Sequence, residues 1–199
     1  FSVSLLSNPA AGDSSYAPPD TTWPSDTQTT TYSGSIRGKI VDGVGTPLGG
    51  IEVKAFPAHT IPASGDCFNP LHLYTEFSAW STSDGSFTLS DVRDGDYILY
   101  AFSHDANFVP AAFPGVQAIS DAQHIFVQNG NAVTLSGPFV LRTGAIIRGV
   151  VKTEAGTPLM AHVNVHEENG CRWYGAPTDS SGTFRIAGIA AGSWKVQAW

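Results

Sequence analysis

The sequence predicts an all-β protein made of tandem antiparallel β-sandwiches, and three observations lead to this fold class. Two parts of the chain repeat the same spaced residues. Apolar residues alternate with a period of two, which is typical of half-buried strands. The 199 residues include 21 Gly and 13 Pro, which cluster at turns, and no helical period separates the strand candidates. Short strands joined by tight turns indicate sandwiches rather than a βαβ fold.

The repeat consists of five pieces that recur in the same order. Gly-Thr-Pro-Leu recurs unchanged, and the pieces around it match at spaced positions. The paired ranges are 34–42 with 147–151, 45–48 with 156–159, 51–56 with 163–165, 84–89 with 181–186, and 97–101 with 194–198. Chance does not produce this many matches in one order. We therefore expect a first sandwich over residues 34–141 and a second over residues 142–199.

Each repeated piece has the pattern of a strand with one buried face. In the first piece, Ile36, Gly38 and Ile40 share one face, whereas Arg37 and Lys39 share the other. Turn residues follow each piece, so the strands are expected to be short.

These motifs resemble a known family. The order Gly-x-Ile-x-Gly-x-Ile, Gly-x-Pro-Leu, Ile-x-Val, Asp-Gly-x-Phe-x-Leu and Gly-Asp-Tyr is similar to that of the carboxypeptidase regulatory-like domain. The resemblance covers residues 34–141 and restarts at about residue 144; the stretches 108–115 and 133–141 resemble the variant found in repeat arrays of secreted bacterial proteins. It implies the seven-stranded Greek-key sandwich of the transthyretin (prealbumin) type. Members of the family are appendages of enzymes, adhesins and surface proteins, so the resemblance implies a fold and no single function.

The second unit matches only part of the first. In the first unit, two strand candidates, 123–127 and 133–141, follow the strand 97–102, whereas the second unit stops within the matching strand. An orphan strand candidate, Phe1 to Leu6, precedes a Pro-, Ser- and Thr-rich linker that runs to residue 33. Either the chain is a segment of a longer array, or Phe1, Val3 and Leu5 of one molecule complete the second unit of another in a head-to-tail polymer.

Composition limits the partners. The hydrophobic fraction of 42% and charged fraction of 14% exclude a disordered chain. The formal net charge of −7 opposes nucleic-acid binding, and no apolar run is long enough to insert into a membrane. The low Lys content with abundant Thr, Ser, Asn and Gly is typical of extracellular or cell-surface proteins. The expected partners are other copies of the chain, further domains of a longer chain, or a glycan or matrix.

Candidates for metal binding and for a disulfide lie in loops. His59, Cys67 and His72 share one long loop, but an ordinary loop is the favoured interpretation and no metal is expected. Cys67 and Cys171 occupy corresponding loops of the two units. In an extended array such loops lie beyond the disulfide reach of ~7 Å between Cα atoms. Pairing therefore requires domains that fold back, or a cysteine elsewhere.

No cofactor is expected either. Asp84, Asp91, Asp94 and Asp96 cluster near turns, where carboxylates can bind calcium, but Asp-Gly is also ordinary turn chemistry. There is no Ser-His-Asp order, phosphate loop or dinucleotide fingerprint, so the chain is not expected to be an enzyme.

Three aromatic residues are the candidates for ligand contact. Trp80, Trp173 and Tyr174 lie on or beside the third strand of each unit and its loop. Exposed together, they would stack on sugar rings; partial burial against a neighbouring unit or the linker is the other interpretation.

The favoured function is a non-catalytic structural or interaction module, such as a surface stalk, adhesin or fibre subunit. The alternatives are a glycan- or matrix-binding accessory module and the regulatory tail of a secreted hydrolase such as a metalloprotease.

Overall fold

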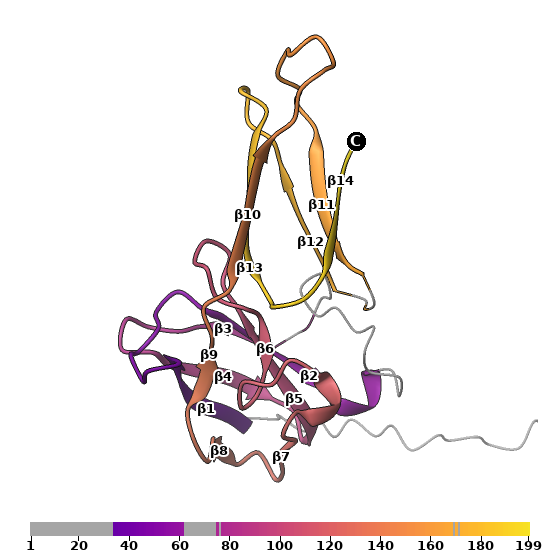
Figure 1. Cartoon of the computed structure of the whole chain (residues 1–199). Coiled ribbons are helices and arrows are strands. Elements are labelled where there is room, and N and C mark those ends of the chain that lie inside the picture. Colours follow the sequence, from indigo (N-terminus) through magenta and orange to yellow (C-terminus); the bar gives the residue numbers. More distant parts are fainter. Residues whose placement is uncertain (1–33, 62–74, 76, 169, 171) are drawn as a thin grey trace, which may run out of the picture. The chain divides into compact units, whose positions relative to one another are not determined.

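The computed structural model describes residues 34–61, 75, 77–168, 170 and 172–199 (Figure 1). All of them lie in one compact unit, Tyr32–Trp199. Phe1, Val3, Leu5, Cys67, His72 and Cys171 lie outside the described residues, so the predictions of strand exchange, of a disulfide and of a metal-binding loop stay predictions.

The first half of the chain forms two sheets that face each other, which confirms the all-β sandwich prediction. One sheet has the order β4-β1-β8, with β9 also paired to β1, and the other has the order β3-β2-β5-β6, with β7 also paired to β5. The strands are β1 (Gly34–Asp42), β2 (Glu52–Pro57), β3 (Phe77–Trp80), β4 (Ser86–Val92), β5 (Gly95–Phe102), β6 (Ala111–Ala112), β7 (Ile125–Val127), β8 (Ala132–Thr134) and β9 (Phe139–Leu141). Two short 3-10 helices, Ala58–Thr60 and Ile119–Asp121, are the only helices of the described residues.

Two details differ from the prediction. The single strand expected over residues 133–141 is divided into β8 and β9, because Gly137 and Pro138 interrupt it and proline has no N–H to donate. Both β8 and β9 pair in parallel with β1, although antiparallel pairing was expected throughout. The reason is a crossover: β7 pairs with β5 in one sheet and the chain then returns along β1 in the other. The Greek-key count of seven stays a prediction.

The core of the first sandwich is closed by β9. Phe139 and Leu141 are fully buried, and Val140 between them is half-buried, as the alternation of a strand requires. The ring of Phe139 meets the ring of Phe113 edge-on, with centroids 5.5 Å apart. Large fully buried side chains come from both sheets, among them Ile36, Ile40, Val53, Leu89, Leu99 and Val127.

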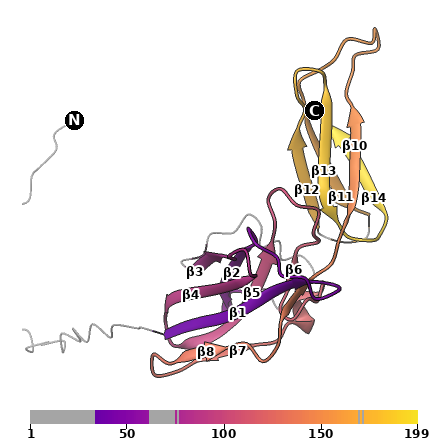
Figure 2. The same ribbon diagram turned by 90° about the vertical axis from the view of Figure 1, so that its left-hand side faces the viewer.

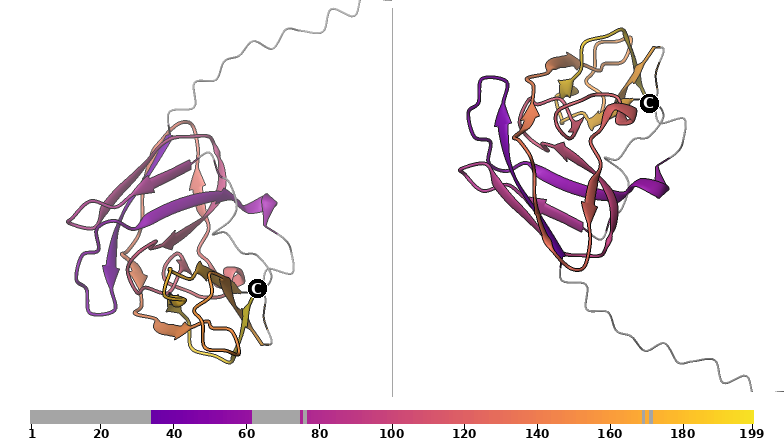
Figure 3. Two further views of the ribbon diagram at one scale, coloured as in Figure 1. Left: turned by 90° about the horizontal axis from the view of Figure 1, so that it is seen from above. Right: turned by 90° about the horizontal axis from the view of Figure 1, so that it is seen from below.

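The second half of the chain repeats the local pairing with fewer strands (Figure 2). β10 (Ala145–Val150) pairs with β13 (Thr183–Ile189), and β11 (His162–Glu167) lies between β12 (Trp173–Pro177) and β14 (Trp194–Ala198). Its core is small and consists of Val163, Val165, Phe184, Ile186 and Ile189 with partly buried neighbours. Figure 3 shows the same strands from above and below.

The two halves share a register and one packing detail. The β1–β4 ladder shifts between Gly34 and Ile36, and the β10–β13 ladder shifts between Ala145 and Ile147. Gly149 faces Phe184 as Gly38 faces Phe87. A Cβ at Gly149 would lie 2.8 Å from the Phe184 ring, and one at Gly38 would lie 2.7 Å from the Phe87 ring. Both glycines are therefore required by the aromatic ring that covers them. The domain boundaries 1–33, 34–141 and 142–199 remain predictions.

Replacement of Phe139 by alanine is expected to lower the free energy of unfolding by about 3–5 kcal/mol, because it leaves a cavity in a closed core. Urea unfolding followed by far-UV circular dichroism measures this. Phe126→Ala is the matched control, because Phe126 lies on β7 of the same sandwich and is 59% exposed. Equal losses in the two variants would contradict the assignment of β9 as the closing strand.

Candidate functional site

The sheet edges of the second sandwich are its most distinctive feature. In the first sandwich, β1 has neighbours on both sides, and so does β5. Among the described residues, β10 pairs only with β13, and β14 pairs only with β11 (Figure 2). Each of these two strands therefore presents a row of free backbone N–H and C=O groups.

Side chains of the edge strand β14 are more exposed to solvent than the matching side chains of β5. Val196 on β14 matches Leu99 on β5 in the repeat, yet Val196 is 51% exposed and Leu99 is fully buried. Trp194 is only partly buried, whereas its match Tyr97 is 3% exposed. Matching positions thus differ in burial because one sandwich has closing strands and the other, within the described residues, has none.

The side chain of Asn107, in the loop after β5, binds two backbone groups of the second sandwich. Its Nδ2 donates to the Gly144 carbonyl at 2.6 Å, and its Oδ1 accepts from the Gly188 N–H at 2.8 Å. The Gly144 N–H donates to the Asn107 carbonyl at 2.9 Å. Gly188 has a φ of +71°, and a Cβ there would lie 2.5 Å from the Phe108 carbonyl oxygen. This network ties the start of β10 and the end of β13 to the loop after β5.

Arg172 is held by acceptors from two parts of the chain. Its Nε donates to Glu167 Oε2 at 2.9 Å, its Nη2 contacts Glu167 Oε1, and its Nη1 donates to Gln117 Oε1 at 3.1 Å. The hydrogen bonds from Arg172 hold the pKa of Glu167 below its ordinary value. Arg172 is consequently occupied by protein acceptors.

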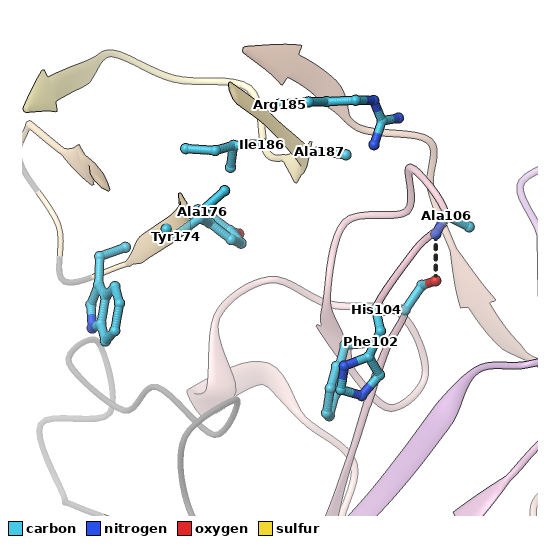
Figure 4. Close-up of a pocket in the computed structure, with 11 residues that line it drawn as sticks. Phe102, His104, Ala106, Tyr174, Ala176, Arg185, Ile186 and Ala187 are labelled. Atoms are coloured by element: carbon cyan, nitrogen blue, oxygen red, sulfur yellow. Dashed lines mark hydrogen bonds between the residues drawn. The ribbon is translucent and has the colours of Figure 1, made fainter. Parts of the chain in front are cut away.

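A pocket of about 430 Å³ is lined by Ala106, which precedes Asn107, and by Trp173, which follows Arg172, among others. We call it the junction pocket (Figure 4). Figure 4 shows Phe102 and His104 on one side of it and Tyr174 on the other. Burial raises the pKa of the Tyr174 hydroxyl, so that this group is neutral and able to donate. The lining residues are Phe102, Ser103, His104, Ala106, Trp173, Tyr174, Gly175, Ala176, Arg185, Ile186 and Ala187.

Trp80 lies outside the lining of the junction pocket and contacts His104, which lines it. Trp80 is 55% exposed, and its ring stacks on the His104 ring with centroids 5.2 Å apart and planes 30° apart. His104 Nε2 and Glu52 Oε2 form a hydrogen bond of 2.8 Å, which fixes the imidazole. Trp80 and Glu52 are direct partners in the β2–β3 ladder, so the histidine covers the outer face of this sheet.

Of the three predicted aromatic residues, Trp173 and Tyr174 line the pocket, and Trp80 lies outside the lining. Tyr174 packs against the core of the second sandwich. Their role in ligand contact stays a prediction. Sequence reasoning did not group His104 or Arg185 with these aromatic residues. No pattern in the sequence relates His104 to Trp80. Arg185 carried a signal, because it replaces Thr88 of the first unit in the repeat.

The other described residues that the sequence singled out do not come together in one site. His59 lies exposed in the short helix Ala58–Thr60. Asp84 accepts hydrogen bonds from Thr82 and Ser86, and Asp94 accepts from the N–H groups of the 129–130 turn. In the part of the chain that the structure describes, no three His, Cys, Asp or Glu residues gather as metal ligands do. The expectation of no metal and no cofactor stays a prediction.

Together these features define the class: the chain is an all-β sandwich protein. No family model matches the sequence, and no curated protein matches it. No helix among the described residues has the length and apolar character needed to cross a membrane.

Several solved structures are similar to the chain. The Bacillus anthracis TIE protein is 13% identical over 84% of this chain and 28% of its own, with a TM-score of 0.37. A streptococcal ancillary pilin is 14% identical over 85% of this chain and 54% of its own, with a TM-score of 0.42. A type II cohesin–X-dockerin complex from Acetivibrio cellulolyticus is 18% identical over 56% and 58%, with a TM-score of 0.35. The chain thus spans less than two thirds of each, and these likenesses assign it no function.

Loss of the Asn107 side chain is expected to destabilise the protein by roughly 1–3 kcal/mol, because Asn107→Ala leaves the Gly188 N–H and the Gly144 carbonyl without their partner. Urea unfolding followed by tryptophan fluorescence measures the change. Asn131→Ala, at an exposed asparagine of the first sandwich, is the control and should be nearly neutral. Equal stability of the Asn107 variant and wild type would show that the network does not hold the link.

Proposed function

We propose that this chain is a non-catalytic structural module of an extracellular or cell-surface assembly, such as a stalk, adhesin or fibre, whose second sandwich is completed by added β strands. The observation that carries the proposal is the contrast between Val196, which is 51% exposed, and its buried match Leu99. The resemblance to carboxypeptidase regulatory-like repeats of secreted proteins belongs to the same proposal.

Backbone hydrogen bonding and hydrophobic burial both favour the addition of a strand. An added strand pairs the free N–H and C=O groups of an edge, as in other β-strand complementation. It also covers apolar side chains, and full burial of one side chain such as valine stabilises by about 1.5–3 kcal/mol. Both gains apply to β10 and to β14.

The first sandwich is the template for the added strand. β9 pairs in parallel with β1, with Ile40 opposite Phe139 and Asp42 opposite Leu141. The segment Phe1-Ser2-Val3-Ser4-Leu5 has the same order of a buried-type aromatic, a spacer and a buried-type aliphatic residue. We therefore take this segment of a second copy as one donor, and further residues of a longer chain as the other.

The 199-residue chain is expected to self-associate as its concentration rises, if the donor is Phe1 to Leu5 of a second copy. Sedimentation velocity over a concentration series measures this, and Val3→Lys should abolish it, because in the proposed donor strand Val3 would enter the acceptor's core. Ser4→Lys is the matched control, because a period of two would place Ser4 on the opposite face of that donor strand. A monomeric wild type whose β10 and β14 amides resist hydrogen exchange without any added strand would overturn the proposal.

The mass of the denatured protein from its natural source separates the two donors. A mass that corresponds to the 199 residues places the donor strand in a second copy. A larger mass, together with a monomeric 199-residue chain whose β10 and β14 amides exchange rapidly, places it in a longer chain.

A further inference from the structure

The two sandwiches share a β bulge that contains a residue with a positive φ. The register of the β1–β4 ladder shifts at this bulge, and so does that of the β10–β13 ladder. In the repeat, Asp91 of β4 matches Gly188 of β13, and their φ angles are +56° and +71°. The backbone conformation is therefore similar in both sandwiches, although the residue type differs.

The fold of a sandwich does not by itself require glycine at this bulge. Aspartate is one of the few residues with a side chain that adopts a positive φ at low cost. Asp91 does so in the first sandwich, where it is exposed. The glycine of the second sandwich therefore has a cause outside the bulge itself.

That cause is the loop after β5, which lies directly on Gly188. A Cβ at residue 188 would lie 2.5 Å from the carbonyl oxygen of Phe108. This is too close for two nonbonded atoms, and a backbone carbonyl cannot turn away as the end of a flexible side chain can. The N–H of Gly188 also donates to Asn107 Oδ1 at 2.8 Å. A side chain at residue 188 would thus displace the loop and break this hydrogen bond.

Gly144, which leads into β10, belongs to the same contact. A Cβ there would lie 2.8 Å from the Cα of Gly188. The N–H of Gly144 donates to the Asn107 carbonyl at 2.9 Å, and Asn107 Nδ2 donates to the Gly144 carbonyl at 2.6 Å. We call the contact of Gly144 and Gly188 with the 107–108 loop the glycine joint. It needs a glycine at residue 188 and an amide side chain at residue 107.

We propose that the residue at this bulge decides whether a sandwich of this repeat docks on the sandwich that precedes it in the chain. Gly188 admits the 107–108 loop, so the second sandwich is fixed to the first. Asp91 excludes an equivalent loop from the first sandwich, because its Cβ takes the space that the Phe108 carbonyl occupies at Gly188.

The bulge surface is thus an interaction surface whose partner is a neighbouring copy of the repeat. In a longer chain, a sandwich placed before residue 34 would be joined to the first sandwich without a glycine joint, so the two would reorient independently. This inference concerns the joint alone and does not depend on the strand addition proposed above.

The test places the residue of the first sandwich into the second, by Gly188→Asp in the 199-residue protein. Amide relaxation measured by NMR, at a concentration below that of any self-association, gives a rotational correlation time for each sandwich. The two values should be equal in the wild type, because the glycine joint makes the sandwiches tumble together. In Gly188→Asp, the value of the second sandwich should fall below that of the first, since the smaller body then reorients independently.

Gly156→Asp is the matched control. It introduces the same side chain into the same sandwich at a φ of +86°, where a Cβ would meet nothing within 4 Å. Its two correlation times should stay equal. Asp91→Gly, at the bulge of the first sandwich, should also leave them equal.

Asn107→Ala keeps the test decisive if Gly188→Asp unfolds the second sandwich. This variant changes only the loop of the first sandwich, and it removes the hydrogen bonds to the Gly188 N–H and the Gly144 carbonyl. The correlation times should separate here too, while the amide resonances of the β10–β13 ladder stay dispersed as in a folded sheet.

Two outcomes would overturn the inference. One is equal correlation times in a folded Gly188→Asp, or in Asn107→Ala when Gly188→Asp is unfolded. The other is a separation in Gly156→Asp as large as that in Gly188→Asp, because aspartate would then act through its positive φ and not through the loop.

Discussion

The structure depends on the closure of a β-sandwich by strands at both edges of its sheets. In the first sandwich, the parallel pairing of β9 with β1 brings Phe139 and Leu141 into the core, and β6 and β7 pair with the edge of β5. Each closing strand satisfies backbone groups and covers apolar side chains, so hydrogen bonding and hydrophobic burial act together. The same strands thus determine both the topology and the buried core.

The second sandwich shows what remains without those strands. Its two ladders keep the register of the first, and Gly149 under Phe184 reproduces the packing of Gly38 under Phe87. Its core nevertheless contains few fully buried side chains, and Val196 lies in the open. The pairing of these strands is therefore independent of the closing strands, whereas the burial of their apolar side chains depends on them. The proposal of strand addition rests on this separation.

The connection between the two sandwiches forms a hydrogen-bond network and a pocket that include residues of both. The Asn107 network ties the loop after β5 to β10 and β13, and the junction pocket lies beside it. Arg172 is used by Glu167 and Gln117 for structure, whereas Arg185 has no protein partner among the described residues.

Much of the fold followed from residue pattern alone. The period-two alternation at Ile36 to Ile40 and the recurring turns with Gly45 and Gly156, both at positive φ, are local properties, and local geometry is encoded in neighbouring residues. The parallel return of β8 and β9, the stacking of His104 on Trp80 and the meeting of Arg148 with Arg185 are not local. They join residues that are distant in the chain and arise only when the sheets have formed, because strand register and loop direction, and not residue type, decide which side chains meet.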